Sequence, residues 1–159
     1  LVLALLIALV QTTVPLYGAA RNDFALMGVA QPAAIAQFIA ILIAFGALTH
    51  AYVTSDFSVI NVAENSHSLK PLLYKISGVW GNHEGSMILW VLILALFGFA
   101  VAQFGVHLPP TLKARVLSVQ ASIGVAFLGF ILLTSNPFLR LDPAPIDGRD
   151  LNPLLQDPG

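Results

Sequence analysis

The chain has 159 residues, of which 57% are hydrophobic and only 9% are charged, and its formal net charge is −1. Soluble domains carry roughly 25% charged residues, so this chain has too few charges to cover a globular surface, and lipid must solvate most of it. The near-neutral charge does not suggest a nucleic-acid partner. The absence of cysteine excludes disulfides, thiolate metal sites and thiol catalysis.

The chain begins with an apolar stretch, residues 1–20, that contains no charged residue. Its length is enough to cross a hydrocarbon core of about 30 Å. A secretory signal peptide is the alternative, because the small residues 18–20 resemble a cleavage site. No basic region precedes the apolar run, so we favour a membrane helix.

A polar break at residues 21–23 separates this span from the second, which we expect at about residues 32–53. Pro32 suits the first turn of a helix. His50, near the far end of this span, is interpreted as an interfacial residue rather than a ligand. Residues 54–77 then form a polar loop with a weak strand signal.

Two more spans follow this loop. Residues 85–112 contain no Asp, Glu, Lys or Arg, and we expect the third span at about residues 86–104, ended by the proline pair 109–110. The fourth span is expected at about residues 116–134. Residues 1–134 therefore predict an all-α fold, a polytopic transmembrane helical bundle of about four spans, with both chain ends on one side.

The last segment, residues 135–159, holds five of the ten prolines. We interpret it as an ordered surface segment, with a turn at Asp147-Gly148 and a short helix capped by Asn152-Pro153. Basic residues do not decide the orientation: three follow spans one and three, and four lie on the other side. The basic residues after spans one and three are Arg21, Lys113 and Arg115, and those on the other side are Lys70, Lys75, Arg140 and Arg149. The first three lie in short loops, which slightly favours a cytoplasmic position for these loops.

Rare residue types gather at the entrance to the third span, where residues 77–90 read SGVWGNHEGSMILW. If a helix runs through this whole stretch, its polar and aromatic residues share one face and its glycines share another. The glycine face would allow a second helix to approach closely. The first face holds Trp80, His83, Glu84, Met87 and Trp90, and the second holds Gly78, Gly81 and Gly85.

Three blocks of this sequence resemble one known family, the CcmF-type cytochrome c haem lyases, the large membrane subunit of the cytochrome c maturation system. The first block is Trp80-Gly81-x-His83-Glu84-Gly85-Ser86, where x is any residue, followed by Leu89-Trp90. The second is Ser135-Asn136-Pro137-Phe138. The third is Asp147-Gly148-Arg149-Asp150-Leu151-Asn152-Pro153 and the residues up to Gly159.

The resemblance implies a bacterial, multi-pass inner-membrane protein that helps to transfer haem and attach it covalently to apocytochrome c. It places residues 54–77 and 135–159 in the periplasm. The implied partners are the lipid bilayer, a haem chaperone, the apocytochrome-presenting subunits and apocytochrome c. The implied cofactor is haem b in the full-length protein, but the family's ligand histidines have no counterpart in this chain. We therefore assign no axial ligand, no catalytic residue and no metal ligand, and leave open whether the chain is itself an enzyme.

Four residues are candidates for a haem-contacting surface: Trp80, His83, Trp90 and Arg149. Trp80 and Trp90 could stack on a porphyrin, although interfacial or packing roles are favoured, with Trp90 packed inside the bundle. His83 could instead bond a loop carbonyl, with Glu84 favouring the helix N-terminus. Arg149 could bind a propionate, but a local salt bridge with Asp147 and Asp150 is favoured.

The alternative function is a membrane transport or proton-translocating subunit, in which His50, His83 and Glu84 would be relay groups. A relay predicts ionisable residues deep in the spans. Residues 85–112 contain no Asp, Glu, Lys or Arg, and this absence counts against a relay.

Overall fold

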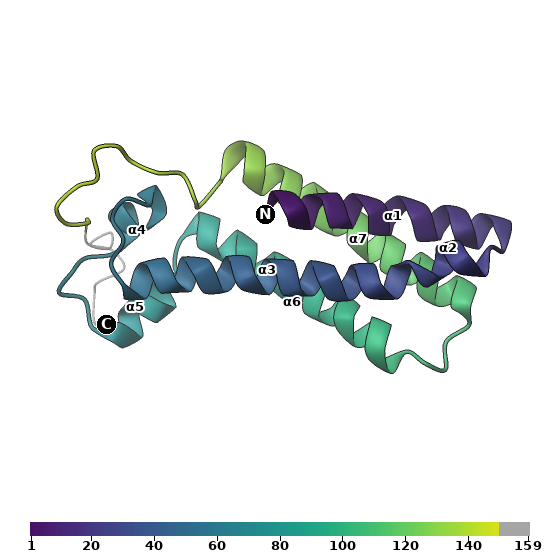
Figure 1. Ribbon diagram of the computed structural model, residues 1–159. Helices are drawn as coiled ribbons and strands as arrows, with labels where there is room; N and C mark the ends of the chain where they lie inside the picture. The colour runs from purple at the N-terminus through teal and green to yellow at the C-terminus, as the bar shows by residue number, and fades with distance from the viewer. Residues whose placement is uncertain (150–159) are drawn as a thin grey trace.

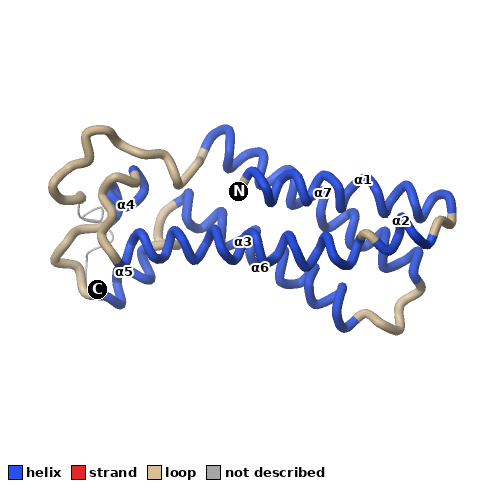
Figure 2. Tube along the Cα trace, in the orientation of Figure 1, coloured by secondary structure: helices blue, strands red, loops and turns tan. Residues whose placement is uncertain are grey.

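The computed structural model describes residues 1–149, and these residues form helices and no strand (Figures 1 and 2). Four stretches are long and apolar enough to cross a membrane, which confirms the prediction of an all-α bundle with four spans. The long helices are α1 (Val2–Arg21), α3 (Ala30–Val53), α6 (His83–Phe104) and α7 (Pro110–Thr134). The short helices are α2 (Phe24–Gly28), α4 (Ile60–Asn65) and α5 (Leu72–Gly78).

The long helices run side by side, with α1 packed along α7 and α3 packed along α6 (Figure 1). The connecting segments gather at the two ends of this bundle. One end carries α4, α5, the turn of residues 79–82 and the segment of residues 135–149, and we call it the motif end. The other carries α2 and the loop of residues 105–109, and we call it the opposite end (Figure 2).

Two spans begin earlier than the sequence pattern indicates. The sequence predicts the third span from about residue 86, whereas α6 begins at His83. The fourth is predicted from about residue 116, whereas α7 begins at Pro110. Proline fits the first helical position because its missing N–H has no intrahelical partner there. The basic residues at the start of the fourth span therefore lie within α7.

Small residues lie between the long helices, and large apolar residues face outward. Alanine and glycine at helix interfaces let backbones approach closely in lipid, where no hydrophobic force drives helices together. The buried small residues include Ala4, Ala8, Ala34, Ala44, Ala95, Gly98, Ala102, Ala121 and Gly124. Exposed large residues such as Leu6, Ile43, Phe97 and Val119 form the surface that lipid solvates.

Side-chain amides tie the spans together inside the bundle. Gln11 of α1 is fully buried, and its Nε2 donates to the Leu117 carbonyl of α7 at 3.1 Å. The Ser118 hydroxyl of α7 donates a hydrogen bond to the Gln11 carbonyl at 3.1 Å. Gln120 Nε2 of α7 donates to the Leu94 carbonyl of α6 at 2.8 Å. Such interhelical bonds fix the helix register in an apolar medium.

The weak strand signal in residues 54–77 is wrong, because this segment forms the helices α4 and α5. Val59, Val62 and Ala63 are all buried, and their spacing puts them on one helical face. Strand-like pairing in the described residues is confined to an isolated bridge between Val59 and Arg140. Burial on one face therefore overrides the β-branched composition.

Candidate functional site

The turn before α6 ends the helical face that the sequence predicts from Trp80 to Trp90. Asn82 is extended, with φ −121° and ψ 167°, and its Oδ1 accepts from the Gly85 N–H at 2.8 Å. This is an N-cap, which satisfies an N–H that has no partner within the helix. Trp80 and Gly81 lie in the preceding turn, so they do not share the α6 face. Asn82, not His83, fixes the helix start.

A group of buried and half-buried polar side chains joins α3, α4 and the start of α6. We call Tyr52, Asn61, Asn82 and Glu84 the polar cluster. Tyr52 Oη donates to Asn61 Oδ1 at 2.7 Å and accepts from Asn82 Nδ2 at 2.9 Å. Asn61 Nδ2 lies 2.9 Å from Asn82 Oδ1 and 3.2 Å from Glu84 Oε2. Tyr52 and Asn61 are 0% and 3% exposed, so these bonds offset a large desolvation cost.

The polar cluster extends into the short helices at the motif end. Asn65 Nδ2 donates to the Asn61 carbonyl at 2.9 Å, and Lys70 Nζ donates to the Asn65 carbonyl at 3.1 Å. Gly78 of α5 lies against the Tyr52 ring, and a Cβ built on Gly78 would be 3.5 Å from Tyr52 Cε1. One tyrosine at the end of α3 therefore supports both α4 and α5.

The segment after α7 lies along α4. The Ile60 N–H donates to the Leu139 carbonyl at 2.9 Å, and the Leu141 N–H donates to the Ser58 carbonyl at 2.8 Å. Farther on, the Arg149 N–H donates to the Ala63 carbonyl. Residues 135–149 are thus held by backbone bonds at both ends of α4, and the helix becomes the centre of the motif end.

Asp147 bonds to the loop after α4 rather than to Arg149, so the predicted salt bridge between these two residues is wrong. Its carboxylate accepts from the Ser68 N–H at 3.0 Å and the Ser68 hydroxyl at 2.6 Å, and it lies 3.3 Å from His67 Nε2. Gly148 makes this approach possible, because a Cβ there would be 2.0 Å from the Ser66 carbonyl oxygen. The Arg149 side chain is exposed.

The predicted contributions of Asp150, Asn152 and Pro153 lie outside the described residues.

We expect acid to release this contact. Hydrogen bonds from Ser68, first from its hydroxyl, hold the pKa of Asp147 below its usual range. A carboxyl with a lowered folded pKa stabilises the fold above its unfolded pKa of about 3.9 and loses that contribution as pH falls through the folded value. At pH values below about 4, the Ser68 amide should lose hydrogen-exchange protection, after correction for its intrinsic exchange rate.

Asp142→Asn, on the same segment, should leave this pH profile unchanged, whereas Asp147→Asn should flatten it. A profile that is identical in wild type and Asp147→Asn would contradict the assignment.

His83 and Trp90 lie along α6 on the side of α7. The His83 ring meets Phe130 edge-on, with centroids 6.4 Å apart, and Trp90 meets Phe127 in the same way at 6.4 Å. Trp90 is 59% exposed, so it lies on the outer surface of the described bundle and not inside it as the sequence predicts. The inward positions of α6 belong to smaller side chains such as Val91 and Ala95, which allow closer helix packing.

Gly85 serves the turn rather than a helix interface. A Cβ built on Gly85 would be 1.6 Å from the Val79 carbonyl oxygen, so only glycine lets that carbonyl lie against the first turn of α6. Trp80, beside this turn, is 43% exposed. The structure therefore does not gather the four candidate residues into one pocket: His83 and Trp90 face α7, and the backbone of Arg149 is bonded to α4.

The described residues contain no group of three or more His, Cys, Asp or Glu side chains that could hold a metal ion. A small polar cavity of about 90 Å³ lies beside the polar cluster, between α4 and the end of α7. Its walls include Asn61, Glu64, Glu84 and Asn136. The motif end thus offers a hydrogen-bonded polar surface with two carboxylates, rather than a deep ligand pocket.

One known protein family matches the part of the chain that contains the turn before α6. The profile described as "Cytochrome C assembly protein" matches residues 80–159, about half of the chain. The chain belongs to this family. The match starts at Trp80. It therefore contains the turn before α6, the last two of the four long helices, α6 and α7, and the segment that lies along α4.

Curated relatives match the chain over its whole length. It is 67% identical to the cytochrome c-type biogenesis protein Ccl1 of Rhodobacter capsulatus and 64% identical to CycK of Rhizobium meliloti, each over 159 residues. It is 48% identical to CcmF of Escherichia coli over 160 residues. The chain spans about a quarter of the length of these relatives, between 24% and 25%.

A solved structure titled "Cytochrome c Heme Lyase CcmF" shares the arrangement of the helices. The TM-score is 0.78 at 28% sequence identity, over 86% of this chain and 23% of that chain. Most of the described fold is therefore shared with this haem lyase structure.

Proposed function

We propose that this chain is part of a membrane component of cytochrome c biogenesis, which helps to transfer haem and attach it covalently to apocytochrome c. Family membership supports the proposal, as do the relatives, which are named cytochrome c-type biogenesis proteins. We place the protein in the bacterial inner membrane with its motif end toward the periplasm. Its partners would be a haem chaperone, the apocytochrome-presenting subunits and apocytochrome c.

The observation that carries this proposal is the convergence of three distant sequence blocks on α4. Asn82 and Glu84, from the first block, bond to Asn61. Leu139, directly after the second block, bonds to Ile60. The third block bonds to Ala63 through the Arg149 N–H. Residues that the family profile matches thus build one continuous surface at one end of the bundle, which is the arrangement a docking platform needs.

The described residues do not fit a haem site by themselves. Each of the four histidines lies in a different place: His50 in the last turn of α3, His67 beside Asp147, His83 on α6, and His107 in the loop at the opposite end. They offer no pair of histidines to one iron. We therefore derive no step through haem and assign this part of the protein a positioning role for the motif end.

The structure gives no support to a proton relay. Besides the Tyr52 hydroxyl, the buried polar side chains among residues 1–149 are amides and serine hydroxyls, and none of these groups ionises near neutral pH. They are Gln11, Gln37, Asn61, Ser66, Ser118 and Ser135. Ionisable groups of a relay would lie deep in the spans.

The test is complementation with the full-length protein in a bacterial strain that lacks its own equivalent. We expect wild type to restore haem-stained c-type cytochromes, and His83→Ala to reduce them about tenfold, which is the effect that one lost contact has on an affinity. The haem absorbance of the purified variant should stay unchanged, because His83 contributes to a surface and not to iron ligation.

His107→Ala is the matched control, since it removes the same side chain from an exposed loop at the opposite end, and it should retain full maturation. Failure of wild type to restore cytochromes would refute the proposed function. Loss of haem absorbance in His83→Ala would instead place that residue in a haem site and refute the platform role.

A further inference from the structure

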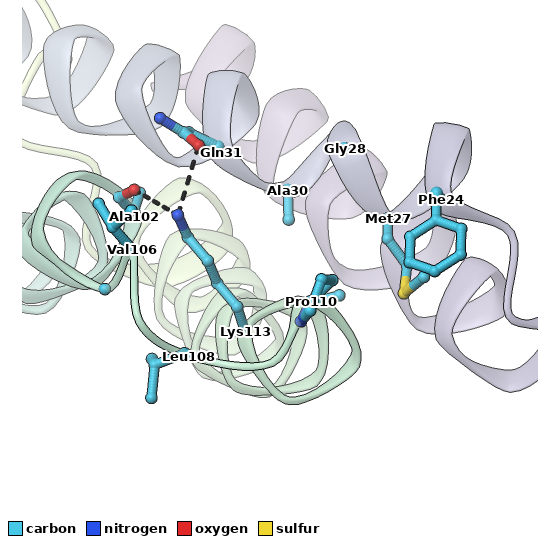
Figure 3. A pocket seen from close by; sticks show the side chains of 12 residues that line it. Phe24, Met27, Gly28, Ala30, Gln31, Ala102, Val106, Leu108, Pro110 and Lys113 are labelled. Carbon is cyan, nitrogen blue, oxygen red and sulfur yellow. Dashed lines mark hydrogen bonds between the residues drawn. The ribbon is translucent and has the colours of Figure 1, made fainter.

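A cavity of about 460 Å³ lies at the opposite end of the bundle, away from the motif end (Figure 3). This volume is within the range of about 300–1,000 Å³ that is typical of small-molecule sites. The walls come from α2, the start of α3, the end of α6, the following loop and the start of α7. The cavity therefore sits where the spans end, at the boundary between lipid tails and headgroups.

Lys113 supplies a positive charge to this cavity. Its Nζ donates to the Ala102 carbonyl at 2.6 Å and to Gln31 Oε1 at 3.3 Å (Figure 3). Both acceptors are neutral oxygens, a backbone carbonyl and a side-chain amide. An ammonium group has three donors, so one N–H remains for a ligand. A half-buried cation at a membrane boundary is stabilised by a nearby anion.

The charge around the cavity also favours an anion. Arg21, Lys113 and Arg115 lie at this end of the bundle, and the acid near them is Asp23. The Asp23 carboxylate caps α2 and accepts from the Ala25 N–H at 2.9 Å and the Leu26 N–H at 3.3 Å. Three cations against one engaged carboxylate give a positive field that attracts negatively charged groups.

Apolar side chains form the rest of the walls and continue onto the outside of the bundle. Phe24 is 71% exposed and Val106 is 75% exposed, and Met27 and Leu108 lie beside them. A ligand with both a phosphate and hydrocarbon chains would contact the cation and this apolar border together. Free phosphate would use only the first of these features.

We propose that this cavity binds the headgroup of an anionic phospholipid, with Lys113 Nζ on a phosphate oxygen and the acyl chains beside Phe24 and Val106. Basic pockets between transmembrane helices bind such headgroups in other membrane proteins. The bound lipid would link the ends of three helices through Lys113. Lys113 is on α7, and its two acceptors, Gln31 and Ala102, are on α3 and α6.

Native mass spectrometry of the delipidated full-length protein tests this proposal, with phosphatidylglycerol added back. The apparent affinity for this lipid should fall about tenfold in Lys113→Gln, the loss of one charge-assisted contact. Arg115→Gln is the matched control, because it removes the same charge two positions along α7 without lining the cavity, and it should match wild type. An equal loss in both variants, or no loss in either, would overturn the site.

Two measurements on wild type keep the proposal testable if Lys113→Gln does not fold. A phosphatidylglycerol analogue with a photoreactive headgroup should label residues 24–31 or 102–114, and labelling confined to other segments would refute the site. Excess inorganic phosphate should not displace the lipid, and phosphatidylcholine should bind at least about tenfold more weakly. Displacement by phosphate alone would identify a free phosphate site instead.

Discussion

Gly85→Ala is expected to destabilise the protein strongly, even though alanine is the better helix former. The added Cβ would lie 1.6 Å from the Val79 carbonyl oxygen and 2.8 Å from the Val79 carbonyl carbon. These are backbone atoms, which cannot rotate away as the end of a flexible side chain could. The turn must therefore move, and the Asn82 cap on the Gly85 N–H is lost with it. Overpacking and cap loss together cost roughly 3 kcal/mol or more.

Two other glycines provide controls for this substitution. A Cβ on Gly129 in α7 meets nothing within 4 Å, so Gly129→Ala should be neutral or stabilising by up to about 1 kcal/mol. A Cβ on Gly81 would be 3.6 Å from its nearest neighbour, which is ordinary contact. Thermal unfolding of the purified full-length variants should rank Gly85→Ala far below both. If Gly85→Ala unfolded at the wild-type temperature, the close approach of the Val79 carbonyl would be wrong.

The four spans could be predicted from the sequence because lipid leaves a simple signature, namely long stretches without charge. Residues 85–112 show this most clearly, and they contain all of α6 after its first two residues. The helix starts were harder to predict. His83 and Glu84 are polar, so the pattern places the span after them, although the Asn82 cap allows them to form the first turn of the helix.

The polar cluster could not be predicted, because its members are far apart in the sequence. Tyr52 lies near the end of the second predicted span, and Asn61 lies in the stretch 54–77 that is predicted to be a polar loop. Only the folding of α4 against the end of α3 brings them within 2.7 Å. A signal for Asn82 was present, since Asn a few residues before an apolar helical run is a typical N-cap. Nothing comparable marks Asn61, which depends on tertiary contacts alone.

The partner of Asp147 could not be predicted from its neighbours in the sequence. Two oppositely charged residues two positions apart suggest a salt bridge, but Gly148 lets the backbone press against the Ser66 carbonyl and the Phe57 ring. That approach turns the Asp147 carboxylate toward Ser68. Hydrogen bonds to a backbone N–H and a hydroxyl then replace an exposed ion pair, which would contribute little.

Asn82→Ala is expected to be the second severe substitution, because one side chain serves three structural elements. It removes the α6 cap, which is worth about 1 kcal/mol. It also removes two hydrogen bonds of the polar cluster, from Asn82 to Tyr52 Oη and from Asn61 Nδ2 to Asn82, and each such bond contributes about 1 kcal/mol. We expect a total loss of roughly 3 kcal/mol in thermal or denaturant unfolding, together with reduced cytochrome c maturation. Asn65→Ala, which removes one bond to the Asn61 carbonyl, should cost only about 1 kcal/mol.

A double-mutant cycle decides whether Asn82 acts through α3 or only as a cap. Tyr52→Phe keeps the ring against Gly78 and removes only the hydroxyl that links Asn61 and Asn82. If the polar cluster is one unit, the loss in the double variant should be smaller than the sum of the single losses by about 1–2 kcal/mol. Additive losses would show that the cap works alone and that α3 does not support the motif end. Coupling would mean that the membrane span α3 and the periplasm-facing platform we propose are held in one rigid arrangement, through a tyrosine that the family motif does not contain.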